Sequence, residues 1–138
     1  MKPHNKTIAI ASIVILFGGI SSSMVAANST RNAIIKDFAS QAGVPLSADR
    51  GKALFESRAG GGKPDTPSCT TCHGASAMST GKTRAGKQIE PMAVSKTPVR
   101  FTELKKVKKW FRRNCKSVLG RECTPQEKGD FLTFMSSQ

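Results

Sequence analysis

The chain has 138 residues, of which 22 are basic and 9 acidic, giving a formal charge of +13 at pH 7. Hydrophobic residues make up only 38% of the chain, which suffices for one modest domain and excludes a large multi-domain enzyme. Four cysteines, two histidines and one tryptophan, with no tyrosine, leave few residues that can carry redox, metal or acid–base chemistry.

Residues 1–27 have the layout of a secretory signal peptide. A basic start at Lys2 and Lys6 precedes the apolar stretch Ile8–Ile20 and small residues, with cleavage expected after Ala27. The alternative is an uncleaved membrane anchor, which the short apolar core disfavours. Cleavage removes two of the 22 basic residues and no acidic one, so the charge belongs to the exported domain. We expect the periplasm, where disulfides persist, and an acidic protein surface rather than nucleic acid as partner.

The predicted elements after residue 27 are helices and loops. Apolar spacing predicts a helix from Asn28 to Val44, ended by Gly43, so that residues 28–46 form a helical extension ahead of a main domain at 47–138. A second helix should begin at Ser47 or Asp49 and run through Glu56. Residues 74–98, rich in Gly, Ser, Thr, Lys and Pro, predict a long loop that is functional, wrapped around something, or disordered.

Two helices are expected in the C-terminal third. Thr102 can cap a helix from Glu103 to about Asn114. The run Thr124-Pro125-Gln126-Glu127 is a capping box that opens a final helix to Met135. Since no repeat or strand pattern is present, the sequence predicts an all-α fold.

The sequence Cys69-x-x-Cys72-His73 is the attachment motif for c-type haem. The two thiols add to the porphyrin vinyl groups, and the adjacent histidine supplies the proximal nitrogen to iron. A thioredoxin-like dithiol would need an alternating strand–helix pattern, and a zinc site would need further ligands. The mature chain has no other histidine, and its remaining cysteines lie over 40 residues away. One covalent haem c is therefore predicted, and its apolar bulk would replace a thin side-chain core.

The ligand on the other side of the iron is open between Met92, which follows Pro91 in the long loop, and Asn114. A methionine would give a closed six-coordinate electron carrier. In the predicted helix, Trp110 and Asn114 share an apolar arc, and an amide facing a core is costly unless something binds it. Asn114 could also be a helix cap, and water could take the position. The pattern alone slightly favours Met92.

A second cysteine pair, Cys115 and Cys123, encloses a short loop. In an oxidising compartment a disulfide is the simplest interpretation, with a redox switch as the alternative. The helix ahead of Cys115 carries a basic face, which is either a solvated surface or a docking site for an acidic redox partner. This basic face consists of Lys105, Lys106, Lys108, Lys109, Arg112 and Arg113.

Three stretches of the chain resemble the sphaeroides haem protein group of class I cytochromes c. They are Gly61–Gly74 around the haem motif, Arg112-Arg113-Asn114-Cys115, and Gly120-Arg121-Glu122-Cys123-Thr124-Pro125. The resemblance extends from about Ser47 to the C-terminus and implies the class I fold, small helices around one covalent haem, here with an extra N-terminal helix.

The resemblance also assigns roles to single residues. It implies haem attachment through Cys69 and Cys72, with His73 as the proximal ligand. Asn114 becomes the distal ligand of ferric iron, ahead of Met92. It further implies a disulfide between Cys115 and Cys123.

The function implied by the resemblance is redox-gated ligand binding. On reduction the asparagine leaves the iron, which opens to oxygen, nitric oxide or carbon monoxide, while electrons arrive from a dihaem or other c-type cytochrome. The competing hypothesis is a closed electron carrier that uses Met92. A third is a haem oxidoreductase acting on oxygen or nitric oxide, for which no separate general acid or base is recognisable. A membrane is a partner only if the N-terminal segment is uncleaved.

Overall fold

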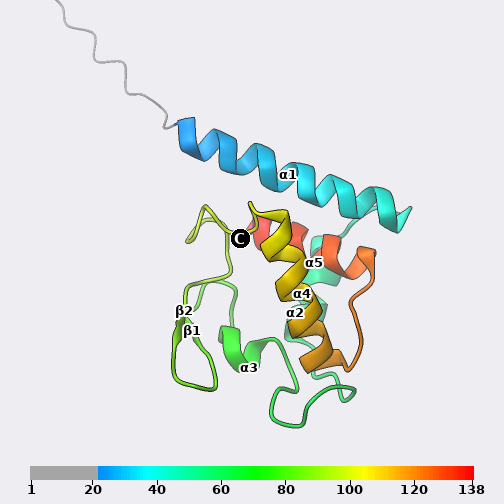
Figure 1. Ribbon diagram of the computed structural model, residues 1–138, viewed down its shortest axis with the longest axis vertical. Coiled ribbons are helices and arrows are strands. Elements are labelled where there is room, and N and C mark those ends of the chain that lie inside the picture. The colour runs from blue at the N-terminus through cyan, green and yellow to red at the C-terminus, as the bar shows by residue number, and fades with distance from the viewer. Residues whose placement is uncertain (1–21) are drawn as a thin grey trace, which may run out of the picture.

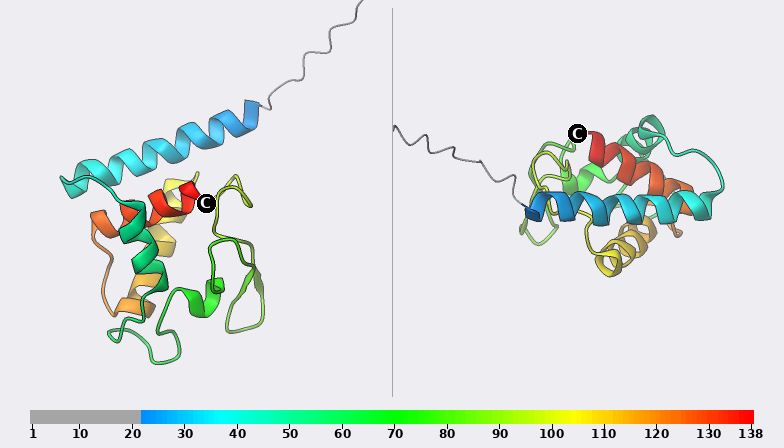
Figure 2. Two further views of the ribbon diagram at one scale, coloured as in Figure 1. Left: turned by 180° about the vertical axis from the view of Figure 1, so that it is seen from behind. Right: turned by 90° about the horizontal axis from the view of Figure 1, so that it is seen from above.

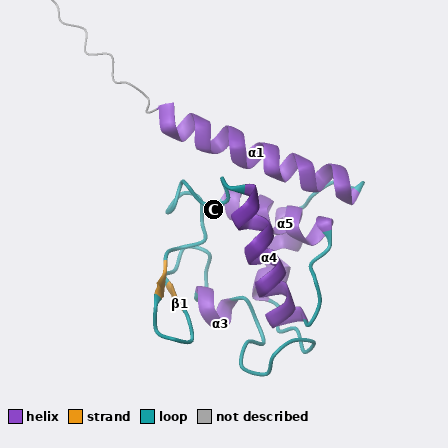
Figure 3. Ribbon diagram, viewed as in Figure 1, coloured by secondary structure: helices purple, strands orange, loops and turns teal. Residues whose placement is uncertain are grey.

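The computed structural model describes residues 22–138, and its regular structure is helical apart from one short hairpin (Figure 1). The elements are α1 (Ser22–Ala42), α2 (Ala48–Glu56), α3 (Thr70–His73), β1 (Gly81–Lys82), β2 (Gln88–Ile89), α4 (Leu104–Leu119) and α5 (Pro125–Ser137). Loops make up much of the remainder, as Figure 3 shows. The predicted all-α class is confirmed. Among the described residues, no helix is both long enough and apolar enough to cross a membrane.

Helix α5 lies at the centre of the packing, against both α1 and α2. Helix α1 forms an outer layer over the other helices (Figures 1 and 2). The buried face of α5 carries Phe131, Leu132, Phe134 and Met135. The ring of Phe131 lies 5.5 Å from that of Phe111, so α4 packs onto the same core.

Two helices begin where the sequence predicts. The hydroxyl of Ser47 accepts a hydrogen bond from the Arg50 amide at the start of α2. At the start of α5, Thr124 Oγ1 accepts from the Glu127 amide, and Glu127 Oε2 accepts from the Thr124 amide. Both arrangements satisfy amides that have no partner within the helix.

The predicted start of the first helix is wrong. Helix α1 already includes Ser22, the first described residue and six positions before Asn28, and therefore continues through the expected cleavage point after Ala27. Most of the predicted signal peptide, residues 1–21, lies outside the described residues. The end is as predicted, with Gly43 in a left-handed conformation at φ +66°.

The predicted limits of the helix around residues 103–114 are also wrong. Thr102 does not cap α4, because its hydroxyl donates to the carbonyl of Val99 and Glu103 holds the N-cap position. The helix continues past Asn114 to Leu119, where Gly120 ends it at φ +73°. Asn114 is therefore an interior helix residue and not a cap.

The long loop contains a short hairpin that the sequence analysis did not predict. Gly81 pairs with Ile89 and Lys82 with Gln88, in antiparallel register. Strands of two residues are too short to show an alternating pattern. The hairpin matters to the site because Gly81 lies against the end of α3, where a Cβ atom would be 2.1 Å from the Cys72 carbonyl oxygen.

Candidate functional site

A cavity of about 790 Å³ lies among α3, the hairpin, the loop at 90–103 and α4. Its walls are largely apolar, with contributions from Leu54, Ile89, Val107, Phe111 and Phe131. All six residues predicted to contact the cofactor line this one cavity: Cys69, Cys72, His73, Met92, Trp110 and Asn114.

The Cys-x-x-Cys-His segment forms α3 together with the residue before it. The Ser68 hydroxyl accepts a hydrogen bond from the Thr70 amide at the start of this turn. Cys69 and Cys72 take part in no disulfide, and burial raises the pKa of the Cys69 thiol to about 11. Before haem attachment the Cys69 thiol is therefore protonated at neutral pH.

His73 is held in a neutral form. Burial, together with the positive charge of Arg100, lowers the pKa of His73 to about 4. Its Nδ1 is buried and has no hydrogen-bond partner among the described residues. A neutral imidazole is the form that binds a metal.

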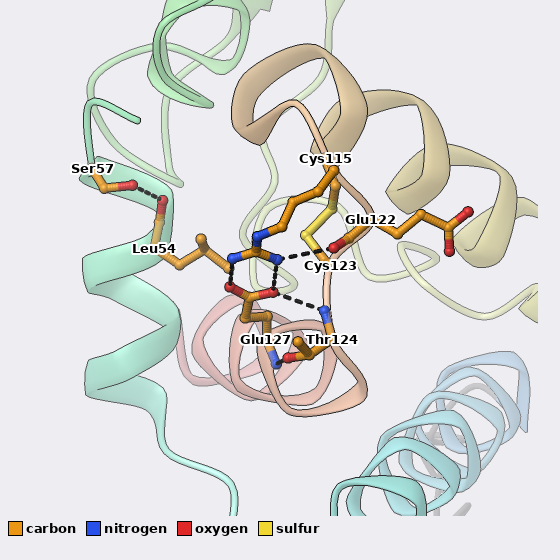
Figure 4. The surroundings of a disulfide bond; sticks show 8 residues. Leu54, Ser57, Cys115, Glu122, Cys123, Thr124 and Glu127 are labelled. Carbon is orange, nitrogen blue, oxygen red and sulfur yellow. Dashed lines mark hydrogen bonds and ion pairs between the residues drawn. A yellow bond between two sulfur atoms is a disulfide. The ribbon is translucent and has the colours of Figure 1, made fainter. Parts of the chain in front are cut away.

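Helix α4 forms the second wall and brings Val107, Trp110, Phe111 and Asn114 to the cavity. Asn114 is partly buried, and its side-chain amide makes no hydrogen bond to any described residue. The next residue, Cys115, is bonded to Cys123, so this turn of α4 is tied to the start of α5 (Figure 4). An amide at the edge of a mainly apolar cavity, without a hydrogen-bond partner in the described part of the chain, is a candidate ligand.

Met92 also lies in the cavity wall, but within the hydrophobic core. Only 6% of its surface is exposed, and it belongs to the same buried cluster as Phe131 and Leu132. The amide of Ala93, the next residue, donates to the Ala77 carbonyl. The cavity lining alone therefore does not separate Met92 from Asn114.

Arg31, which was not predicted from the sequence, holds the loop at Pro98–Arg100 beside the cavity. Its side chain in α1 is 2% exposed, with Nε donating to the Arg100 carbonyl at 2.9 Å and Nη2 to that of Pro98. Arg100 in turn donates through Nε to the Pro91 carbonyl at 3.0 Å. A signal was available, because Arg31 is three residues before the buried Ile34 and so lies on the same helix face.

Phe101 marks strain in the same loop. It is the one residue other than glycine with a positive φ, +63°, among residues 22–138. Its ring lines the cavity and packs edge-on against Phe131 at 6.3 Å. A bulky residue in this conformation persists only where its surroundings hold it there.

The described residues fit a large, mainly apolar cofactor. The cavity volume is within the range of ligand pockets, about 300–1,000 Å³. Two free thiols and a neutral imidazole line it at the spacing that covalent haem attachment requires.

Comparison with known proteins agrees with this fit. Residues 41–135 match the family described as a domain of unknown function, DUF1924. The chain is 49% identical over 125 residues to the cytochrome c-type protein SHP of Cereibacter sphaeroides, covering 91% of this chain and 97% of that protein. It is 34% identical over 71 residues to cytochrome c'' of Methylophilus methylotrophus, covering 51% of this chain and 49% of that protein.

The solved structures give the same result. Oxidized SHP, described as an oxygen-binding cytochrome c, superimposes with a TM-score of 0.76 at 54% identity, covering 78% of this chain and 96% of that one. Oxidized cytochrome c'' superimposes with a TM-score of 0.62 at 26% identity, covering 83% and 96% respectively.

Fold, cavity and relatives together define the class: the chain is an all-α cytochrome c that binds one covalent haem c. It belongs to the DUF1924 family and, among the cytochromes, to the family of SHP. The family resemblance noted in the sequence and the predicted haem cofactor are both confirmed.

Proposed function

We propose that this cytochrome transfers electrons and that Asn114 controls access of a diatomic gas to its iron. The observation that carries the proposal is the placement of Asn114, a side-chain amide without a hydrogen-bond partner in the wall of the cavity that His73 also lines. The similar structure of oxidized SHP is described as that of an oxygen-binding cytochrome c, which supports oxygen as a ligand here.

The residues of α3 would hold the cofactor. Cys69 and Cys72 would each form a thioether to a vinyl group, and His73 would be the proximal ligand through its neutral ring. The haem iron supplies a one-electron change and a coordination position for a small ligand. The apolar side chains of Val107, Phe111 and Phe131 would disfavour water beside this position.

Asn114 would act as a displaceable ligand. An amide oxygen is a hard, neutral donor, and it binds ferric iron better than ferrous iron because the ferric ion carries the greater charge. Reduction of a bound haem would therefore favour release of the amide. The disulfide at Cys115 anchors the backbone next to Asn114, so release would mainly involve the Asn114 side chain.

A closed electron carrier with Met92 as distal ligand is the second candidate, since Met92 is buried in the same wall. A third candidate is a haem oxidoreductase that turns over oxygen or nitric oxide. Showing this activity requires repeated turnover of the gas with a supplied reductant.

We further propose that electrons enter across the basic face of α4 from an acidic partner, such as a dihaem or other c-type cytochrome. Trp110 is 51% exposed at the edge of the cavity. Lys109 and Arg113 each place their charged group 5.6 Å from the Trp110 ring. An apolar centre ringed by cations suits a weak, salt-sensitive encounter.

The proposed location is the periplasm, after removal of residues 1–27 as a signal peptide. Residues 28–46 would form the helical extension and residues 47–138 the cytochrome domain. Mass spectrometry of the exported protein tests the cleavage, since a cut after Ala27 leaves Asn28 as the first residue.

Visible spectra test the role of Asn114. The purified ferrous protein should be high-spin and should shift at once on addition of carbon monoxide. Asn114→Val should make the ferric protein high-spin as well, because the sixth ligand is lost, whereas the control Met92→Leu should keep the parent ferric spectrum. A low-spin ferrous protein indifferent to carbon monoxide, with a far-red methionine band that Met92→Leu abolishes, would instead establish the closed carrier.

A further inference from the structure

A second hollow, of about 980 Å³, adjoins the haem cavity at the C-terminal end of α4. Its charged lining consists of Lys63, Arg84, Arg112, Arg113, Lys116 and Arg121 against the single acid Glu122. Arg84 is paired with Asp65, and Arg121 with Glu127. Within residues 22–138 no carboxylate pairs with the other four cations. The hollow therefore presents unneutralised positive charge and free hydrogen-bond donors.

The frame of this hollow is fixed by backbone contacts. The chain at Gly61 and Gly62 passes the last turn of α4 so closely that a Cβ on Gly62 would lie 2.1 Å from the Ser117 carbonyl oxygen. The same carbonyl accepts hydrogen bonds from the Lys63 amide at 2.7 Å and from Thr66 Oγ1 at 3.1 Å. On the other side, the disulfide from Cys115 ties down the loop that carries Arg121. The cations therefore project from a backbone frame that these contacts hold in place.

The hollow and the haem cavity share three lining residues, Arg84, Asn114 and Ser117. We propose that the hollow binds a small inorganic oxoanion next to the Asn114 amide, and that this anion strengthens the hold of Asn114 on ferric iron. The coupling to iron rests on the proposed function, whereas anion binding itself does not. An oxoanion fits because several donors line one hollow, and the lysines and arginines can each donate to its oxygens.

The coupling follows from the chemistry of an amide. When the amide oxygen is a ligand, the NH₂ group remains a donor, and an anion that accepts from it makes the oxygen a better ligand. Ferric haem also carries one more positive charge than ferrous haem, so a nearby anion favours the ferric form. By reciprocity, the anion must bind the ferric protein more tightly and lower the reduction potential.

Sulfate is the probe, since it is an oxoanion that is a poor ligand for haem iron. The ferric holoprotein is titrated calorimetrically with sodium sulfate replacing sodium chloride at constant ionic strength. The test variant is Lys63→Gln with Lys116→Gln, two lysines that line the hollow. The matched control is Lys105→Gln with Lys108→Gln, two exposed lysines of α4 that line neither space. We expect at least tenfold weaker sulfate binding in the test variant and less than a twofold change in the control.

Redox titrations with and without sulfate test the coupling. Sulfate should lower the reduction potential of the parent and of the control, but not that of the test variant. A tenfold preference for the ferric protein corresponds to 59 mV. Equal weakening of sulfate binding in both double variants, or no binding at all, would overturn the site. Sulfate binding without a change in potential would overturn its coupling to Asn114.

These outcomes are distinguishable from a failure of the proposed function. Carbon monoxide binding by the ferrous protein is measured in chloride buffer without sulfate, so it reports on Asn114 alone. If sulfate does not bind, while the test variant loses affinity for an acidic redox protein, the hollow belongs to the docking surface and the oxoanion proposal is wrong.

Discussion

Arg31 shows how one buried side chain can connect an outer helix to the haem cavity. Its guanidinium donates hydrogen bonds to the carbonyls of Pro98 and Arg100, the residues on either side of Val99. It also donates through Nη1 to Asn28 Oδ1 at 2.7 Å. Since no acid pairs with Arg31 in the described part of the chain, its role is to satisfy and position the backbone beside Phe101.

Replacing Arg31 by Gln should lower the free energy of unfolding by about 1–3 kcal/mol, because buried carbonyl oxygens lose their donors. Thermal or urea unfolding of the holoprotein measures this. The control Arg112→Gln removes an exposed arginine that makes no ion pair to a described residue, and its effect should stay within about 0.5 kcal/mol. Equal effects of the two substitutions would show that Arg31 contributes only its charge.

At the scale of elements, α2 and α5 meet at a point where only glycine fits. A Cβ atom on Gly51 would lie 2.0 Å from the carbonyl oxygen of Asp130. The Asp130 carboxylate, 3% exposed, also accepts from Arg50 Nε at 2.7 Å and from the Ser47 amide at 2.6 Å. The close approach at Gly51 and the ion pair between Arg50 and Asp130 together fix how α2 crosses α5. These two helices support the back of the cavity.

Gly51→Ala should destabilise the fold by about 3 kcal/mol, since the added methyl forces two backbones apart. Gly60→Ala is the control, because a Cβ there meets nothing within 4 Å. Chemical denaturation of both variants compares them. A neutral effect at Gly51 would mean that the helices can separate without cost.

The start of α5 carries a pH-dependent contact. Arg121 binds Glu127 through two hydrogen bonds, and this pairing lowers the pKa of the Glu127 carboxyl below its usual value of 4.5 (Figure 4). Because the folded-state pKa is the lower one, the stabilisation is present above pH 4.5 and is lost as the pH falls through the folded value. Loss of this contact loosens the helix that follows the disulfide.

Glu127→Gln should therefore reduce stability at pH 7 and converge with the parent protein in strong acid. Glutamine can still accept from the Thr124 amide, so the substitution isolates the charge. Urea unfolding from pH 7 to pH 3 measures the difference in free energy between parent and variant. A difference that does not change with pH would contradict the assignment to the carboxylate.

For the whole molecule, the cofactor takes the place of a continuous core. The cavity of about 790 Å³ separates α3 from α4, and it is lined by side chains that also touch the main hydrophobic cluster, such as Met92 and Phe131. Without a cofactor, the side chains that line an apolar space of this size would lack van der Waals contacts on their cavity side.

The double variant Cys69→Ala with Cys72→Ala should lose covalent haem and its cooperative thermal transition together. Haem staining after denaturing electrophoresis reports attachment, and circular dichroism reports the transition. Cys115→Ala with Cys123→Ala is the comparison, which should keep the haem stain and lose about 2–3 kcal/mol of stability. Haem retained through denaturation by the first variant would show that the motif is not the attachment site.

The sequence was most informative where a local pattern determines the structure. The Thr124–Glu127 capping box and the Ser47 N-cap involve neighbouring residues only, so α5 and α2 could be predicted closely. The residues lining the cavity could be named because the haem motif and the apolar arc of α4 are local as well.

Contacts between distant segments could not be predicted from local patterns. Arg31 lies 67 positions from Pro98 and 69 from Arg100, and no local pattern identifies such distant partners. Asn114 resembled a helix end because asparagine commonly caps helices, yet Val118 continues the buried face of α4. The separation of Asn114 from Met92 as ligand likewise depends on spectra, because both line the same cavity.

The contact between Gly62 and the last turn of α4 also constrains how the protein is made. Lys63 and Thr66 lie just before the attachment cysteines, and both bind the carbonyl of Ser117, more than 50 residues further along the chain. These bonds close the ring of polypeptide around the cavity. A rigid planar cofactor passes more easily into an open ring than a closed one, so we expect haem attachment to precede docking of the C-terminal half. In that order, the contact of Gly61 and Gly62 with α4 forms last and completes the fold.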